Sequence, residues 1–127
     1  MSKLIISIDA DGTIWEQAFP AIGNLKPNAK KIINQLYNEG HKIIINSCRS
    51  DTYLEDIRQF LDTHGIRYHS LCEPLPEIKN KYGLSNTHKI YAHIYIDDRN
   101  LGGIPDDWDC IYNIIQNTID KDLIIWD

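Results

Sequence analysis

Two aspartates lie two residues apart where an apolar stretch of the chain ends. Residues 4–8 are short, apolar and rich in β-branched side chains, which predicts a buried strand, and Asp9-Ala10-Asp11-Gly12-Thr13 includes both acids. Gly12 lets the backbone turn sharply and leave both carboxylates at the open end of this strand. A simple Asx-Gly turn explains Asp-Gly alone but not the whole pattern. An EF-hand loop is excluded, because its glycine stands at the sixth position and Gly12 is the fourth residue counted from Asp9.

A second pair of acids follows another predicted strand. Residues 90–96 favour a strand, and Asp97-Asp98-Arg99-Asn100 comes next. Adjacent carboxylates repel each other unless positive charge lies nearby. Mg²⁺ supplies such charge and binds one or two carboxylates together with substrate phosphate oxygens. Taken alone, this motif also fits a solvated loop in which Arg99 pairs with one acid.

Groups that can hold a phosphoryl oxygen follow the strand predicted at residues 41–46. Ser47 offers a hydroxyl, and the backbone N–H groups after it, at Cys48 and Arg49, lie near a helix start. The Arg49 guanidinium can add a charge-assisted contact. Helix capping by Ser47 or Ser50 explains the same residues without any ligand.

A lysine is also expected, because phosphoryl transfer among several carboxylates needs a cation besides the metal. Lys89 lies just before the strand that leads to Asp97, whereas Lys79 and Lys81 are rivals from an irregular segment. The five histidines show no metal-ligand spacing, and no base is evident beside the Cys48 thiol.

The remaining pattern places these motifs on alternating strands and helices. Pro27 suits the first turn of a helix that ends near Gly40, and Ser50 or Asp51 can cap a second helix that ends near Gly65. The other expectations are a short strand at 66–71, a last helix through 108–119, an edge strand or helix tail at 123–126, and irregular segments at 14–26 and 72–88. Such alternation predicts βαβ units and a mostly parallel α/β sheet, in which ligands bind at the carboxyl ends of the strands.

Composition narrows the classes of protein further. A chain of 127 residues predicts one domain, residues 1–127, and 43% hydrophobic and 24% charged residues are ordinary for a globular protein. The net charge of −5 argues against an extended nucleic-acid or membrane surface. Three cysteines, far apart and without a CxxC pair, indicate neither disulfides nor zinc and suit a reducing, cytoplasmic compartment. No signal peptide or membrane span is predicted.

Taken in chain order, these motifs resemble those of the haloacid dehalogenase-like (HAD) superfamily. Its first motif, D-x-D-G-T, matches residues 9–13, and its second, an apolar strand ending in serine or threonine, matches Ser47. Lys89 matches the lysine of the third motif, and Asp97 and Asp98 match the acidic pair of the fourth. Residues 94–105 are similar to a small group of capless bacterial and phage HAD phosphatases of about this length.

The resemblance implies a Rossmann-like three-layer sandwich without a large cap domain, and a phosphohydrolase. Asp9 would be the nucleophile that forms an aspartyl phosphate, and Asp11 would protonate the leaving group and then activate water. Mg²⁺ would bind Asp9, the Asp11 backbone carbonyl and Asp97, with Asp98 nearby or through water. The predicted phosphate-binding set is Ser47, Cys48, Arg49, Lys89 and Gly12.

The sequence leaves several alternatives open. Residues 14–26 and 72–88 are too short for a cap domain, so the site is expected to be open to a phosphorylated small molecule or the phosphorylated end of a larger substrate, or to be shielded by a partner subunit in a homo-oligomer. Ser47 replaces the commoner threonine but keeps the hydroxyl. A phosphotransferase, a pyrophosphatase and a non-catalytic binding protein on a HAD scaffold remain alternatives. A signalling receiver domain is disfavoured, because the middle strand ends at Ser47 rather than at an acid.

Overall fold

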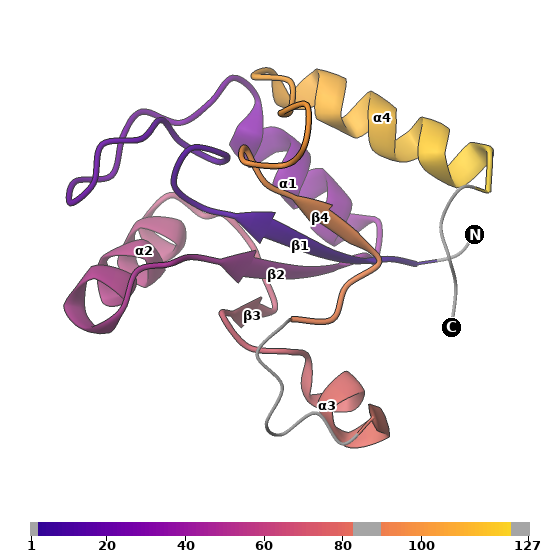
Figure 1. Ribbon diagram of the computed structural model, residues 1–127, viewed down its shortest axis with the longest axis horizontal. Coiled ribbons are helices and arrows are strands. Elements are labelled where there is room, and N and C mark those ends of the chain that lie inside the picture. The colour runs from indigo at the N-terminus through magenta and orange to yellow at the C-terminus, as the bar shows by residue number, and fades with distance from the viewer. Residues whose placement is uncertain (1–2, 83–89, 123–127) are drawn as a thin grey trace.

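The protein is built around a parallel β-sheet. A computed structural model describes residues 3–82 and 90–122. Within these residues the strands are β1 (Ile5–Asp9), β2 (Lys42–Asn46), β3 (Ser70–Leu71) and β4 (Ile94–Ile96), in the order β3-β2-β1-β4 (Figure 1). Every pairing between these four strands is parallel. The fold is therefore the predicted α/β architecture with helices against a parallel sheet, and residues 3–82 and 90–122 form no large cap.

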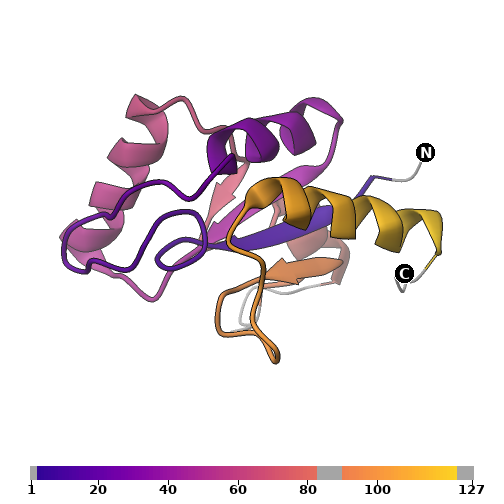
Figure 2. The ribbon, with the colours of Figure 1, turned by 90° about the horizontal axis from the view of Figure 1, so that it is seen from above.

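Helices connect the strands and cover the sheet. They are α1 (Ala29–Asn38), α2 (Asp51–Thr63), α3 (Pro76–Tyr82) and α4 (Trp108–Asp120). Apolar residues recur at helical spacing on α1, where Ile32, Ile33 and Leu36 are buried, so one face of this helix packs inward. Helices α1 and α4 contact each other and lie together in both views of the ribbon, while α3 lies on the other side of the sheet (Figures 1 and 2).

The strand residues alternate between two hydrophobic clusters, as the pleat of a sheet requires. Ile6 and Ile8 of β1 join buried residues of α1, α2 and α4 in the larger cluster. Ile5 and Ile44 face the other way and pack against Leu75, with Ile78 of α3 beside them. Both faces of the central strands are thus covered, which explains why these strands are apolar almost throughout.

Some element boundaries differ from the predictions. Pro27, predicted in the first helical turn, instead precedes the N-cap residue Asn28, whose left-handed backbone (φ 62°) delays the start of α1 to Ala29. The predicted strand at 66–71 shrinks to Ser70–Leu71, and the one at 90–96 shrinks to Ile94–Ile96. Residues 90–92 pack against the smaller cluster instead of extending the ladder.

One helix was not predicted. The segment 72–88, predicted to be irregular, contains α3 at Pro76–Tyr82. This helix is short, and Ile78 is its apolar anchor, so its sequence is too brief to display a helical period. The predicted element at 123–126 lies outside the described residues. In the described part of the chain, each helix is too short or too polar to span a bilayer.

Candidate active site at the carboxyl edge of the sheet

Strand β1 lies where the strand order changes direction. Strands β2 and β3 follow on one side of β1, and β4 lies on its other side. In open parallel sheets, ligands bind beyond the carboxyl ends of the strands at such a point. Asp9, the last residue of β1, is paired with Asn46, and Asp97 follows Ile96, which is paired with Ile8. The topology therefore brings the two predicted acidic motifs together.

Three carboxylates gather at this edge. One oxygen each from Asp9, Asp97 and Asp98 lie within 4.8 Å of one another, and all three side chains are half-buried. Burial first, then the negative charge of Asp97 and a hydrogen bond with Asp98, raise the pKa of Asp9 to about 7. Crowded, partly desolvated oxygen ligands of this kind fit a hard divalent cation such as Mg²⁺, which would offset their repulsion.

Thr13 links the first acidic motif to the second. Its hydroxyl lies 3.1 Å from Asp9 Oδ2 and 3.3 Å from Asp98 Oδ1, and it accepts a 2.9 Å hydrogen bond from the Asp98 backbone N–H. The Thr13 carbonyl oxygen in turn accepts a 3.0 Å hydrogen bond from the buried indole N–H of Trp108. The start of α4 therefore holds the turn that carries Thr13 against the sheet.

Gly12 allows the two motifs to approach closely. Its backbone is left-handed, with φ at 86°. A Cβ atom at this position would lie 2.8 Å from Cγ of Asp98 and would overlap its Oδ2 atom. Glycine is therefore required here by both the backbone conformation and the nearby carboxylate. The structure gives Gly12 a role in placing Asp98, while the predicted contact with phosphate stays a prediction.

The Asp11 side chain contacts different residues from those that surround Asp9. Arg49 Nε and Nη2 each donate a 2.8 Å hydrogen bond to one of its carboxylate oxygens, and Trp15 Nε1 donates a third, at 2.9 Å. Burial acts to raise the pKa of Asp11, but the hydrogen bonds from Arg49 and Trp15 outweigh it and leave this pKa lowered. Asp11 is thus held ionised. The prediction that its backbone carbonyl binds a metal is separate from this contact and stays a prediction.

Arg49 also anchors the loop that follows the first motif. Nη1 donates a 3.0 Å hydrogen bond to the Pro20 carbonyl, and Nη2 donates one of 2.8 Å to the Ala21 carbonyl. With the two bonds to Asp11, these contacts use four of the five guanidinium N–H donors. Arg49 was predicted to contact a phosphoryl oxygen, whereas the structure commits most of its donors to the protein.

The structure describes two of the three other predicted phosphate-binding residues, Ser47 and Cys48. The Ser47 hydroxyl accepts a 2.9 Å hydrogen bond from the Arg49 backbone N–H, and Cys48 is exposed at the edge of the pocket. Lys89 lies outside the described residues. Its rivals Lys79 and Lys81 are exposed on α3, away from the carboxyl edge (Figure 1).

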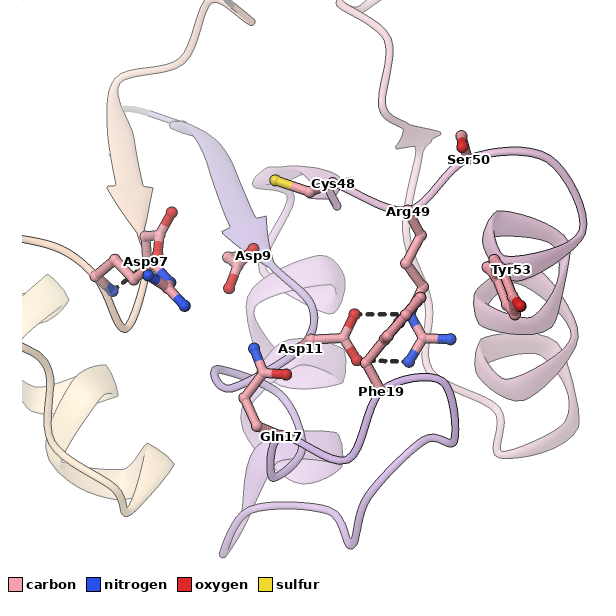
Figure 3. A pocket seen from close by; sticks show the side chains of 10 residues that line it. Asp9, Asp11, Gln17, Phe19, Cys48, Arg49, Ser50, Tyr53 and Asp97 are labelled. Carbon is pink, nitrogen blue, oxygen red and sulfur yellow. Dashed lines mark hydrogen bonds and ion pairs between the residues drawn. The ribbon is translucent and has the colours of Figure 1, made fainter.

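A pocket of about 700 Å³ opens over these residues. Asp9 and Asp97 lie on one side, Tyr53 lies on the other, and the Asp11–Arg49 pair stands between them (Figure 3). Residues from β1, the loop after it, the loop after β2, the start of α2 and the loop after β4 line it: Asp9, Asp11, Gln17, Phe19, Cys48, Arg49, Ser50, Tyr53, Asp97 and Arg99. Five of these were predicted site residues, from three separate segments.

Comparison with solved structures gives a similar chain. It is described as the structure of the conserved protein coded by a locus from Bacteroides thetaiotaomicron, and it matches with a TM-score of 0.82 and 32% sequence identity. The match covers 92% of this chain and 93% of that one. This chain belongs to the same family as the Bacteroides protein. No model of a known protein family matches the chain, and no curated protein matches it.

Some residues of the pocket were not predicted from the sequence. Gln17, Phe19 and Tyr53 lie in segments that lack a motif, and only the folding of the loop after β1 against α2 brings them beside the acids. Thr13 and Trp15 had a detectable signal, because each lies four residues after an aspartate with which it is hydrogen-bonded. Trp15 and Trp108 are both fully buried.

Proposed function

We propose that this protein is a Mg²⁺-dependent phosphohydrolase, a phosphomonoesterase that transfers the phosphoryl group of its substrate to the carboxylate of Asp9. The observation that carries the proposal is the grouping of Asp9 with Asp97 and Asp98 beside a pocket at the carboxyl edge of the sheet. The motif order that resembles the HAD superfamily supports the same chemistry. The substrate would be a phosphorylated small molecule or the phosphorylated end of a larger one.

Asp9, Asp97 and Asp98 are the side chains that would hold Mg²⁺, since their oxygens are close enough to share one ion. When bound, the ion would neutralise negative charge on the carboxylates and on the substrate phosphate. Without a cation, the raised pKa of Asp9 leaves this carboxyl partly protonated at neutral pH. A protonated carboxyl is a poor nucleophile, so activity is expected to depend on a divalent cation.

Asp9 then serves as the attacking group. One of its carboxylate oxygens forms a bond to phosphorus while the bond from phosphorus to the leaving oxygen breaks, which gives an aspartyl phosphate and an alcohol after protonation. Water hydrolyses this intermediate, restores Asp9 and releases inorganic phosphate. The Thr13 hydroxyl, 3.1 Å from Asp9 Oδ2, orients the carboxylate for attack.

Asp11 is the group that would move protons. Because Arg49 and Trp15 hold it ionised, it can accept a proton from the attacking water in the second step. To protonate the leaving group in the first step it must first take up a proton, and this weakens its ion pair with Arg49. The proposal therefore assigns Arg49 to positioning Asp11 rather than to holding phosphate. The assignments of Ser47, Cys48 and Lys89 to phosphate binding remain part of the proposal.

The test measures phosphate release from a panel of phosphate monoesters, with Mg²⁺ and with a chelator, for the wild type, Asp9→Asn and Asp120→Asn. Asp120 is an exposed acid at the end of α4 and serves as the matched control. We expect Mg²⁺-dependent release that Asp9→Asn abolishes and Asp120→Asn leaves unchanged. Wild-type rates in Asp9→Asn would overturn Asp9 as the nucleophile, and an absence of release from the whole panel would overturn the phosphatase.

A further inference from the structure

Two exposed aromatic rings line the same pocket as the acids. Phe19 is 56% exposed and Tyr53 is 45% exposed, although large hydrophobic side chains are usually buried. Their ring centroids are 5.1 Å apart, at an interplanar angle of 61°, which is an edge-to-face pair. Phe19 comes from the loop after β1 and Tyr53 from the first turn of α2, so the pair exists only in the folded chain.

The loop that carries Phe19 is held in place. Arg49 donates hydrogen bonds to the Pro20 and Ala21 carbonyls, and its guanidinium carbon lies 4.9 Å from the Phe19 ring centroid. The two sides of the loop are also joined, because the Glu16 backbone N–H donates a 2.9 Å hydrogen bond to the Asn24 carbonyl. A ring presented in this way can bind a partner without first losing much conformational freedom.

The two sides of the pocket differ in chemical character. Asp9 and Asp97 form an acidic side, where a metal and a phosphoryl group would bind, and Phe19 and Tyr53 lie toward the Arg49 side (Figure 3). A volume of about 700 Å³ exceeds what a phosphoryl group needs and falls within the range of sites for small organic ligands. The pocket therefore has room for an organic group beside the rings.

We propose that the substrates are phosphate monoesters whose organic part contains a flat ring, and that Phe19 and Tyr53 pack against this ring. The inference rests on the proposed phosphatase and names its substrate class. Aromatic side chains pack favourably on flat rings, both aryl groups and nucleobases, and they offer no comparable contact to a small polar chain such as glycerol. Phe19 and Tyr53 are thus specificity residues that contact the leaving group, while Asp9 performs the transfer.

The experiment compares kcat/KM of the wild type, Phe19→Ala and Tyr53→Ala for three phosphate monoesters: 4-nitrophenyl phosphate, a nucleoside 5′-monophosphate and glycerol 3-phosphate. The kcat/KM of each variant is divided by that of the wild type with the same substrate, so differences in leaving-group reactivity cancel. Ile114→Ala, which removes a 54% exposed side chain from α4, is the control for trimming an exposed apolar residue. Circular dichroism checks that each variant keeps the fold.

We expect each aromatic variant to lose about tenfold in kcat/KM for at least one ring-bearing substrate and less than about twofold for glycerol 3-phosphate. A loss of kcat/KM for both ring-bearing substrates indicates that Phe19 and Tyr53 accept any flat ring. A loss for the nucleotide alone indicates that they contact a nucleobase. Equal losses for all three substrates, or none, would overturn the inference and leave the phosphatase standing. No release by the wild type from any of the three, while other members of the panel are hydrolysed, would overturn this inference alone. No release from the whole panel would remove the proposed function, and this inference with it.

A second measurement is independent of turnover. Binding of the nucleoside 5′-monophosphate and of glycerol 3-phosphate to Asp9→Asn is measured by calorimetry in Mg²⁺, with and without Phe19→Ala. Phe19→Ala should weaken binding of the nucleotide about tenfold and leave that of glycerol 3-phosphate unchanged. Unchanged nucleotide binding, together with unchanged kcat/KM for 4-nitrophenyl phosphate, would contradict a role for the Phe19 ring.

Discussion

Arg49 and Asp11 form a bidentate ion pair in which Nε and Nη2 of the guanidinium each lie 2.8 Å from a different carboxylate oxygen. The side chains are only 2% and 14% exposed, so the pair is largely shielded from water. Arg49 also carries the loop that presents Phe19. This contact thereby joins the first acidic motif, the loop after it and the loop between β2 and α2 into one unit.

The Arg49–Asp11 pair should contribute strongly to stability. Arg49→Ala leaves the Asp11 carboxylate buried without its cation, and we expect a loss of about 3 to 5 kcal/mol in the free energy of unfolding. Urea unfolding of Arg49→Ala, Asp11→Ala and the double variant measures the coupling energy. The control is Arg58→Ala, because the Arg58–Glu55 pair is 46% and 55% exposed and should contribute less than about 1 kcal/mol. Similar losses in both arginine variants would contradict the buried-pair interpretation.

Gly12→Ala should cost more than the same change at Gly102. Both glycines have left-handed backbones, with φ at 86° and 83°, so each substitution carries a strain of about 1 kcal/mol. An added Cβ at Gly102 meets nothing within 4 Å, whereas at Gly12 it meets the Asp98 carboxylate. We expect an additional loss of stability and a weaker affinity for Mg²⁺ in Gly12→Ala alone. Thermal unfolding and calorimetric titration measure these two effects.

Mg²⁺ should raise the midpoint of thermal unfolding through the acidic group. A ligand at a hundred times its Kd stabilises the folded state by about 2.7 kcal/mol. Asp97→Asn removes one of the three carboxylates of the group and should reduce this shift, while Asp120→Asn on α4 should not. A shift of equal size in Asp97→Asn would show that the ion binds elsewhere.

Acidification should destabilise the fold through His41. This side chain is buried, its Nδ1 accepts a 3.0 Å hydrogen bond from the Leu4 backbone N–H, and burial lowers its pKa below the usual 6.5. The nearby Glu39 carboxylate opposes this shift and Lys3 adds to it. The unfolded chain therefore takes up a proton first as the pH falls through 6.5, and stability declines from there toward the lower pKa of the folded state.

Protonation of Asp9 changes stability in the opposite direction, so the experiment on His41 is done in a variant without the Asp9 carboxyl. Its pKa of about 7 lies above the usual aspartate value of 3.8, so between pH 7 and 3.8 the folded state holds a proton that the unfolded state lacks, and acidification in this range stabilises the fold. The comparison of His41→Asn with its parent is therefore made in the Asp9→Asn background, with a chelator, between pH 7.5 and about 5.5. We expect a shallower decline in His41→Asn, and an unchanged slope would contradict the assignment.

The sequence alone determined the scaffold of the site because the signals involved are local. A short apolar run followed by D-x-D-G-T predicts a buried strand with acids at its end, and the same holds for Asp97 and Asp98. Parallel strands then bring their carboxyl ends to one edge, so the meeting of these acids with Asp9 could be expected without coordinates. Elements with weak local patterns, such as α3, could not be predicted in this way.

Only the tertiary structure decided which groups each acid contacts. Asp11 and Arg49 are 38 residues apart, and either could have faced solvent or a ligand; the path of the loop through Pro20 and Ala21 pairs them instead. The close approach of Asp98 to Gly12 and the pairing of Phe19 with Tyr53 likewise join separate segments. Such contacts depend on how distant segments close against one another, and sequence spacing does not encode that geometry.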